Sequence, residues 1–237
     1  MSTAQDGSAR AQILARVRAA TGGATGTASD ATRGPAAAAA ADAAYAALPR
    51  DYLRAHHDPA DGDITELFAE RAADYRAVVE RVPTAGLAAA VARILAARTA
   101  DAPGPILVPA GLPAAWLAEL PGNVPRAGDD PPLSPAELGQ AAGVLTGCAT
   151  AIAETGTIIL DHGPGQGRRA LTLVPDFHLV VVEAAQVAAD LPDAFSRLDP
   201  ARPHTLISGP SATSDIELIR VEGVHGPRNL CILIAGS

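Results

Sequence analysis

The sequence contains no lysine, since all 18 of its basic residues are arginines. Schiff-base chemistry and Walker-type phosphate loops both need a lysine amine, so neither can operate on this chain. The formal net charge of −8 argues against a nucleic-acid or anionic-membrane partner. A local site for a small anion remains open, because a guanidinium pairs with carboxylate or phosphate through two hydrogen bonds.

Cysteines and long apolar runs are also scarce. Cys148 and Cys231 lie far apart and outside any CxxC pattern, so we expect neither a disulfide framework nor an iron–sulfur cluster, which needs about four thiolates. We interpret both thiols as small buried hydrophobic residues. The histidines show no metal-ligand spacing, so we expect no metal. Without an apolar run of about 18 residues or a signal-peptide pattern, we expect a soluble cytoplasmic protein with no membrane insertion.

The chain of 237 residues is 48% hydrophobic but only 3% aromatic, so Ala, Val, Leu and Ile must fill its core. We expect residues 1–50 to form an arm rather than a domain. Its parts are a short amphipathic helix over 9–20, a flexible link over 21–35 and a polyalanine run over 36–47 with helical propensity. Residues 51–237 are predicted to form a single α/β domain.

Strand and helix patterns alternate through residues 63–150, which predicts βαβ units and a largely parallel sheet. Strand patterns include RAVVERV and VLTG. Asp63 and Ser134 each precede a helical pattern and carry a glutamate three residues later, which predicts two helix N-caps.

Three apolar runs then follow closely, GTIIL, ALTLV and HLVVVE. Their spacing predicts three strands in an antiparallel or mixed extension of the sheet. A helix over ADLPDAFSRL and strands over HTLIS and NLCILIA complete the domain. The expected fold class is therefore α/β, with a mixed, mostly parallel central sheet flanked by helices.

The stretch AIAETGTIIL carries the first candidate site residue, Glu154. We expect Ala149 to Glu154 to form a helical turn that ends at a left-handed Gly156, before a buried strand. Glu154 would then oppose the helix macrodipole, which favours a functional role over a stabilising one. The alternative is an ordinary ion pair with an arginine.

A glycine-rich loop with two arginines, HGPGQGRR, follows that strand. Its spacing is not GxGxxG, so a Rossmann phosphate loop is not indicated. Arg168 and Arg169 are both able to hold a carboxylate, and Arg169 is the candidate anion anchor, against the alternative of a plain glycine-rich hairpin. His178, at the entrance of the next strand, is either a second anion-binding residue or purely structural.

The block SGPSATSDIE lies between two predicted strands. Ser214 and Glu217 fit a capping box, which gives Asp215 and Glu217 a structural role in the first turn of a helix. In the alternative, Ser211 and Thr213 bind an anion together with free backbone N–H groups.

His225 lies in a Gly–Pro corner that no apolar stripe requires. With an ordinary pKa near 6.5, it is able to remove a proton from a hydroxyl or to polarise a carbonyl. We expect the distant loops to converge in one polar notch at the rim of the sheet, lined by Glu154, Arg169, Asp215 and His225.

Several of these blocks resemble the LUD-domain family, which includes the lactate-utilisation protein C (YkgG-like) proteins. The resemblance is strong over residues 141–233 and weak over 67–108. The matching elements are AETGT at 153–157, Arg169 before LTLVP, Pro175 with His178, SGPSATSDIE and GVHGP.

The resemblance implies a fold like that of the NagB/RpiA/CoA-transferase group and a role in oxidising L-lactate to pyruvate. It also implies two iron–sulfur lactate-utilisation proteins as partners and a small carboxylate such as L-lactate as ligand. By fold analogy alone, a rival is a CoA-transferase-like or nucleotide-ester enzyme that uses Glu154. A third reading is a non-catalytic subunit that binds a small anion or regulates its partners.

Two sets of candidate residues fall on the matching motifs, and their roles are assigned by physical argument. The candidate catalytic residues are Glu154, Asp215 and His225. The candidate substrate- or anion-binding residues are Thr155, Gly156, Arg169, His178, Ser208, Gly209, Ser211, Thr213 and Glu217.

Overall fold

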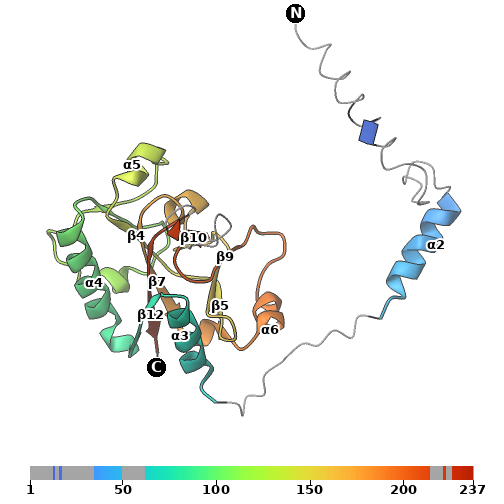
Figure 1. Cartoon of the computed structure of the whole chain (residues 1–237), viewed down its shortest axis with the longest axis horizontal. Coiled ribbons are helices and arrows are strands. Elements are labelled where there is room, and N and C mark those ends of the chain that lie inside the picture. The colour runs from blue at the N-terminus through green and yellow to red at the C-terminus, as the bar shows by residue number, and fades with distance from the viewer. Residues whose placement is uncertain are drawn as a thin grey trace, which may run out of the picture. The chain divides into compact units, whose positions relative to one another are not determined.

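A computed structural model gives the fold of the chain (Figure 1). The structure describes residues 13, 16–17, 35–49, 62–213, 221–222 and 226–236. Contacts divide the chain into two units, Met1–Tyr52 and Leu53–Ser237. The candidate site lies in the second unit.

The first unit is helical over most of the residues described. The helix α2 (Pro35–Ala46) covers the polyalanine run, so the helix predicted there is confirmed. Alanine has the highest intrinsic helix propensity, and proline is favoured at the first helical position. The described side chains of α2 are exposed, so propensity rather than burial forms this helix.

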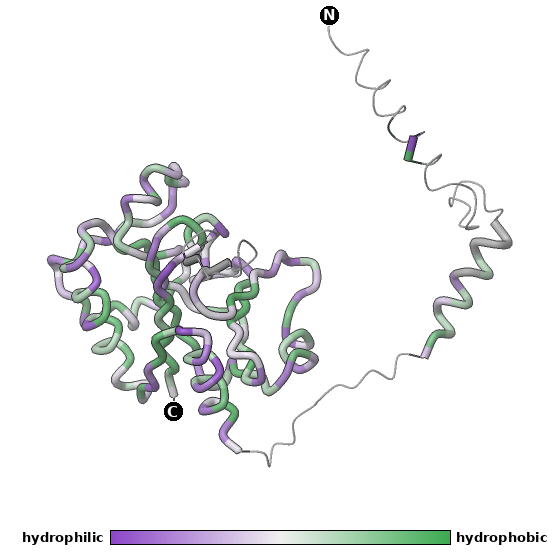
Figure 2. Tube along the Cα trace, in the orientation of Figure 1, coloured by the Kyte–Doolittle hydropathy of each residue, from purple (hydrophilic) through white to green (hydrophobic). Residues whose placement is uncertain are grey.

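The second unit is built on a six-stranded sheet with the order β1-β12-β7-β4-β2-β3, in which every neighbouring pair is parallel. Its strands are β1 (Val78–Val82), β2 (Ile106–Leu107), β3 (Arg126–Ala127), β4 (Gly143–Thr146), β7 (Phe177–Glu183) and β12 (Asn229–Ala235). The strands β7 and β12 are nearly continuous apolar runs because both faces of a parallel sheet are covered. Figure 2 shows these central strands in green, the hydrophobic end of its scale.

Helices and short 3-10 turns flank the strands of this unit. They are α3 (Ile64–Asp74), α4 (Leu87–Asp101), α5 (Pro135–Gly139), α6 (Leu191–Ser196), η3 (Thr84–Gly86), η4 (Ala114–Leu117), η5 (Arg169–Thr172) and η6 (Ala184–Gln186). Val91 and Leu95 of α4 pack with Leu179 on one face of the sheet. Phe68 of α3 packs with Val180 on the other face, because successive strand residues point to opposite sides.

Both predicted helix starts are confirmed by their hydrogen bonds. Asp63 Oδ1 accepts from the backbone N–H of Thr65 at 2.9 Å and caps α3. Ser134 and Glu137 form the capping box of α5, in which Glu137 Oε2 accepts from the Ser134 backbone N–H at 2.7 Å. These bonds satisfy backbone donors that have no partner within the helix.

A four-stranded sheet with the order β8-β5-β6-β9 packs against the face of the central sheet that α3 also covers. Its strands are β5 (Thr150–Ile152), β6 (Thr157–Leu160), β8 (Val187–Ala188) and β9 (Thr205–Ile207). The β5–β6 and β6–β9 pairs are antiparallel and β5–β8 is parallel, so this second sheet is mixed. Of the three runs predicted to form a mixed extension, only GTIIL lies in it, as β6, whereas HLVVVE forms β7 of the parallel central sheet. Ile158 and Leu160 share a core cluster with Val180 and Ile232 of the central sheet. The α/β class, with a central sheet flanked by helices, is confirmed.

Two local predictions are wrong. The stretch from Ala149 to Glu154 is not a helical turn, because β5 occupies it and its three residues are buried. Pairing with β6 on one side and β8 on the other outweighs the helix propensity of alanine there. The run ALTLV is not a strand but overlaps η5, since its backbone N–H groups bond to carbonyls three or four residues back instead of to a neighbouring strand.

A separate antiparallel ribbon joins β10 (Ala212–Thr213) to β11 (Val221–Glu222). The helix start predicted at Ser214 lies outside the described residues. Among the helices described, none has the length and apolar character needed to cross a bilayer.

Candidate functional site

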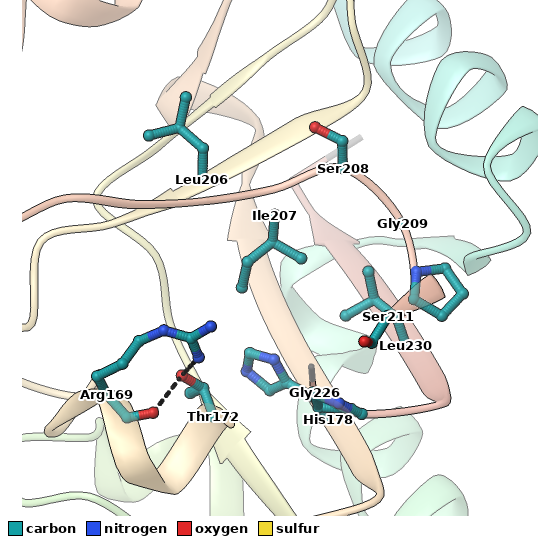
Figure 3. Close-up of a pocket in the computed structure, with 12 residues that line it drawn as sticks. Arg169, Thr172, His178, Leu206, Ile207, Ser208, Gly209, Ser211, Gly226 and Leu230 are labelled. Atoms are coloured by element: carbon teal, nitrogen blue, oxygen red, sulfur yellow. Dashed lines mark hydrogen bonds between the residues drawn. The ribbon is translucent and has the colours of Figure 1, made fainter. Parts of the chain in front are cut away.

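A pocket of about 230 Å³ opens between the two sheets, at the amino-terminal ends of β7 and β12 (Figure 3). Its walls come from η5, from residues 206–211, from His178 and from Leu230 with the turn that precedes it. Pockets for drug-sized ligands measure about 300–1,000 Å³, so this one suits a small metabolite. Open α/β sheets usually bind ligands at the carboxyl ends of their strands, and this pocket lies at the opposite edge.

Asp176 ties the starts of β7 and β12 together. Its backbone carbonyl accepts from the Asn229 N–H at 3.1 Å. Its carboxylate accepts from Arg228 Nε at 2.6 Å and from Asn229 Nδ2 at 3.2 Å. These bonds support the register in which Leu230 lies opposite His178 at the floor of the pocket.

His178 is a buried polar residue of this floor, with 1% of its surface exposed. Its Nε2 lies 2.8 Å from Oγ1 of Thr146, a fully buried residue on the neighbouring strand β4. Burial, together with the positive charge of Arg169, lowers the pKa of His178 to about 3. The imidazole is therefore neutral at physiological pH and is a poor base.

Arg169 supplies positive charge at the mouth of the pocket. Its side chain leaves η5 and is exposed, and its Nη1 donates to Thr172 Oγ1 at 3.3 Å. The Thr172 hydroxyl donates in turn to the Arg169 carbonyl at 3.3 Å. Desolvation lowers the pKa of Arg169, but an arginine in a protein stays charged. No carboxylate of the described residues lies within ion-pair distance of this guanidinium.

The neighbouring Arg168 has a structural role. Its Nε and Nη2 bind the two carboxylate oxygens of Asp129 at 2.6 and 2.9 Å. Within the same loop, the Gln166 side chain donates to Asp161 Oδ1 at 2.7 Å and accepts from the Asp161 backbone N–H at 2.7 Å. These bonds hold the glycine-rich loop in place, and Arg169 is the arginine of the pair that faces the pocket.

Residues in and after β9 form the opposite wall. Figure 3 shows Ile207 pointing into the pocket, whereas the Ser208 hydroxyl points away from Arg169. Ser208 Oγ lies 2.8 Å from Thr157 Oγ1, which lies 2.7 Å from Thr155 Oγ1. This row of hydroxyls joins β9 to β6 and fixes the position of the wall.

Two glycines allow these loops to approach α3 closely. Gly209, at the pocket wall, has a φ of +84°, and a Cβ there would lie 2.6 Å from the carbonyl oxygen of Tyr75. Gly156 has the predicted left-handed conformation, with a φ of +61°, but in a turn between two strands. A Cβ at Gly156 would lie 2.4 Å from the backbone nitrogen of Ala72. Any side chain at either position would push a sheet loop away from the helix.

The structure brings together one group of the candidate residues and separates another. Those that line the pocket are Arg169, His178, Ser208, Gly209 and Ser211. Glu154 and Thr155 are exposed in the turn between β5 and β6 and do not line it. Because that turn follows a strand, the argument from a helix macrodipole no longer applies to Glu154. Thr213 lies in β10, and Asp215, Glu217 and His225 lie outside the described residues.

The sequence did not single out three residues that build or support the pocket, namely Thr146, Thr172 and Ile207. Thr146 carried a usable signal, because it places a hydroxyl in an otherwise apolar strand, GVLT. Its partner His178 lies 32 residues away, so the pairing itself leaves no local pattern.

The pocket combines a charged donor with a neutral buried ring, which suits recognition of an anion. The thiols take no part, because Cys148 and Cys231 are both buried, as predicted. Burial raises the pKa of each thiol, that of Cys231 to about 11, and only the thiolate is a strong nucleophile. Within the described part of the chain, no three His, Cys, Asp or Glu side chains are placed to hold a metal ion.

Known proteins match the part of the chain that contains the pocket. The LUD domain family matches residues 136–235. "Lactate utilization protein C" of Deinococcus radiodurans is 49% identical over 179 residues, which cover 73% of this chain and 80% of that protein. "Lactate utilization protein C" of Bacillus pumilus is 39% identical over 84 residues, 32% of this chain and 35% of that protein. "Uncharacterized protein YkgG" of Escherichia coli is 34% identical over 91 residues, 35% of this chain and 39% of that protein.

A solved structure is similar as well. The crystal structure of a DUF162 family protein from Deinococcus radiodurans has a TM-score of 0.60 and 43% sequence identity, over 73% of this chain and 96% of that chain. The described pocket, from Arg169 to Leu230, lies within the matched domain. From its sequence and its fold alike, the chain belongs to the LUD-domain family.

Proposed function

We propose that this chain is a component of an L-lactate utilisation system and that its pocket binds a small carboxylate such as L-lactate. The names of its relatives support the process. The pocket supports the class of ligand. The observation that carries the proposal is a guanidinium with no acidic partner among the described residues, Arg169, beside the neutral ring of His178.

A carboxylate provides what this pocket lacks. An ionised carboxylate only accepts hydrogen bonds, and a guanidinium is able to bind both of its oxygens at once. Arg169 would receive the carboxylate of lactate at the mouth. Ile207 and Leu230 offer apolar surface for the methyl group.

We further propose that the system oxidises L-lactate to pyruvate, which releases two electrons and two protons. The two iron–sulfur proteins implied by the family would accept the electrons, since this chain has only two cysteines, both buried. Asp215 and His225 remain the proposed proton acceptors, and Glu154 is set aside because it does not line the pocket. His178 is not among them because its pKa of about 3 makes it too weak a base.

The test is reconstitution of the purified chain with its two iron–sulfur partners, L-lactate and an artificial electron acceptor. We expect pyruvate to form at a rate that depends on this chain. Arg169→Ala should lower the rate at subsaturating lactate by about 10- to 100-fold, as expected for loss of a charged hydrogen-bonded contact.

Arg93→Ala is the matched control, because Arg93 is an exposed arginine on α4 that pairs with Glu80. That variant should keep the full rate. A rate that is unchanged when the whole chain is omitted would reject the proposed function. Full activity of Arg169→Ala would reject only the proposed role of Arg169 and would leave the proposed function in place.

A further inference from the structure

We infer that Thr146 fixes His178 in the neutral tautomer with its proton on Nδ1, so that His178 donates a hydrogen bond to the ligand and the pocket selects a carboxylate over the corresponding amide. This inference deepens the proposed function, since it names the group of the ligand that is recognised and a residue that sets the selectivity. Thr146 is a positioning residue, because it acts through His178.

The Thr146–His178 pair is enclosed within the protein. Thr146 and His178 lie on the adjacent parallel strands β4 and β7, and both side chains are almost fully buried. The distance of 2.8 Å between Thr146 Oγ1 and His178 Nε2 is that of a good hydrogen bond. One of the two atoms must donate the proton.

The direction of this hydrogen bond follows from the protons that the two side chains carry. A hydroxyl has one proton, and Thr146 Oγ1 has no hydrogen-bond partner other than His178 among the described residues. If Nε2 carried a proton and donated it, the Thr146 hydroxyl proton would be buried without an acceptor. Buried donors are rarely left unpaired, because they lose their hydrogen bonds to water without replacement. The hydroxyl therefore donates to Nε2, and the single ring proton lies on Nδ1.

Nδ1 is the ring nitrogen of His178 that is available to a ligand. His178 lines the pocket, and Figure 3 shows its ring on the side of the pocket where Arg169 and Thr172 lie. Nδ1 has no hydrogen-bond partner among the described residues. It is also not fully buried. Its N–H is therefore open to a molecule in the pocket.

The ring of His178 carries no positive charge. Burial and the nearby Arg169 disfavour a second proton on His178, so the ring presents one donor and no positive charge. The Thr172 hydroxyl does not compete for the ligand, because it already bonds to the Arg169 side chain and carbonyl.

The ligand then meets two donors, the guanidinium of Arg169 and the N–H of His178. A carboxylate offers acceptors to both of them. An amide of the same shape brings an NH₂ group that only donates, so one of the two donors would face another donor. The opposite tautomer would expose a bare Nδ1 acceptor and would favour the amide instead.

The test uses the full chain labelled with ¹⁵N-histidine. Two-bond ¹H–¹⁵N correlation spectra distinguish the two neutral tautomers, and His178→Gln assigns the signals of His178 among the six histidines. We expect the wild-type His178 to carry its proton on Nδ1. Thr146→Ser should keep this pattern, whereas Thr146→Val, which removes the hydroxyl at similar volume, should shift the population towards Nε2–H.

Binding of L-lactate and L-lactamide is measured on the same samples. The wild type and Thr146→Ser should prefer L-lactate by at least about tenfold, and Thr146→Val should show a smaller preference, because only Arg169 still favours the carboxylate. A wild-type spectrum with the proton on Nε2 overturns the inference whether or not Thr146→Val folds.

Failure of the inference is separable from failure of the proposed function. If the tautomer is as expected and acetate binds while L-lactate and acetamide do not, the inference stands and the lactate proposal falls. If L-lactate and L-lactamide bind equally well to the wild type, the donor role of His178 is rejected while the lactate proposal survives.

Discussion

Two hollows lie at the same end of the central sheet on its opposite faces, and Leu230 contributes to both. The pocket with Arg169 and His178 measures about 230 Å³. The second hollow, the α4 groove, measures about 390 Å³ and is lined by α4, β1 and the starts of β7 and β12. Four arginines line the α4 groove, namely Arg76, Arg93, Arg98 and Arg228.

Size and positive charge would favour the α4 groove, but Arg93, Arg98 and Arg228 already have partners within the chain. Arg93 binds Glu80 at 2.7 Å, and Arg228 binds Asp176 at 2.6 Å. Arg98 donates to the carbonyl of Ala142 and lies over the ring of Phe177. In the smaller pocket, by contrast, the Arg169 guanidinium has no acidic partner among the described residues. A site is therefore better recognised by its unsatisfied polar groups than by its volume.

The largest difference between the hollows should appear in ligand affinity. Arg169→Ala should weaken L-lactate binding by about 10- to 100-fold, because it removes the charged donor of the pocket. Arg93→Ala, in the α4 groove, should leave the Kd unchanged within about twofold. Isothermal titration of both variants makes the comparison, and a loss in Arg93→Ala with an unchanged Kd in Arg169→Ala would place the lactate site in the α4 groove.

Acid should reveal the second largest difference. The pKa of His178 is about 3 in the folded chain and about 6.5 in the unfolded chain. Between these values His178 binds a proton in the unfolded chain but not in the folded chain. The contribution of His178 to the free energy of unfolding is therefore fully present above about pH 6.5 and is lost as the pH decreases. From pH 7 to pH 5, this one group should lower the free energy of unfolding by about 2 kcal/mol.

Urea unfolding at both pH values measures this loss. His178→Gln should reduce the difference between pH 7 and pH 5 by that amount, whereas Arg93→Ala should keep it. An unchanged pH dependence in His178→Gln would show that His178 is not held neutral by burial.

A smaller effect is expected at the rim that the hollows share. Arg228→Ala removes the exposed ion pair with Asp176, and such pairs contribute little to stability. We expect the midpoint of thermal unfolding to fall by at most about 4 °C, with L-lactate affinity within about threefold. A loss as large as that of Arg169→Ala would make Asp176 and Arg228 part of the binding site.

The smallest expected response is that of the thiols. Cys231 lines the α4 groove, but it is 6% exposed and its pKa is about 11. At pH 7 only about one in ten thousand Cys231 thiols is ionised. A disulfide reagent should therefore label Cys231 in urea and not in the native chain. Rapid native labelling that Cys231→Ala abolishes would show that the α4 groove opens wider than the structure indicates.

Much of the fold could be predicted from the sequence because its signals are local. The apolar runs of β7 and β12 and the caps at Asp63 and Ser134 depend on residues close to one another in the chain. The errors occurred where distant partners decide the outcome. Alanine and glutamate in β5 and its turn favour a helix locally, but strands β6 and β8 hold this segment extended.

The same distinction applies to the site. Arg169 and His178 were identified from their place in motifs, and both line the pocket. The structural role of Arg168 could not be predicted, because its partner Asp129 lies 39 residues upstream. The role of Thr146 was not predicted for a similar reason, since its partner His178 lies on a neighbouring strand and not nearby in the chain.

The pocket is also built from an interior strand of one sheet and an edge strand of the other, and these two strands differ in how many neighbours hold them. Its floor belongs to β7, a strand at the interior of the six-stranded sheet, while one wall comes from β9, a border strand paired through three residues. Replacements in the floor disturb the cooperative centre of the fold, whereas replacements in the border strand alter mainly the shape of the opening. Substitutions in the border strand can thus reshape the opening of the pocket at little risk to folding.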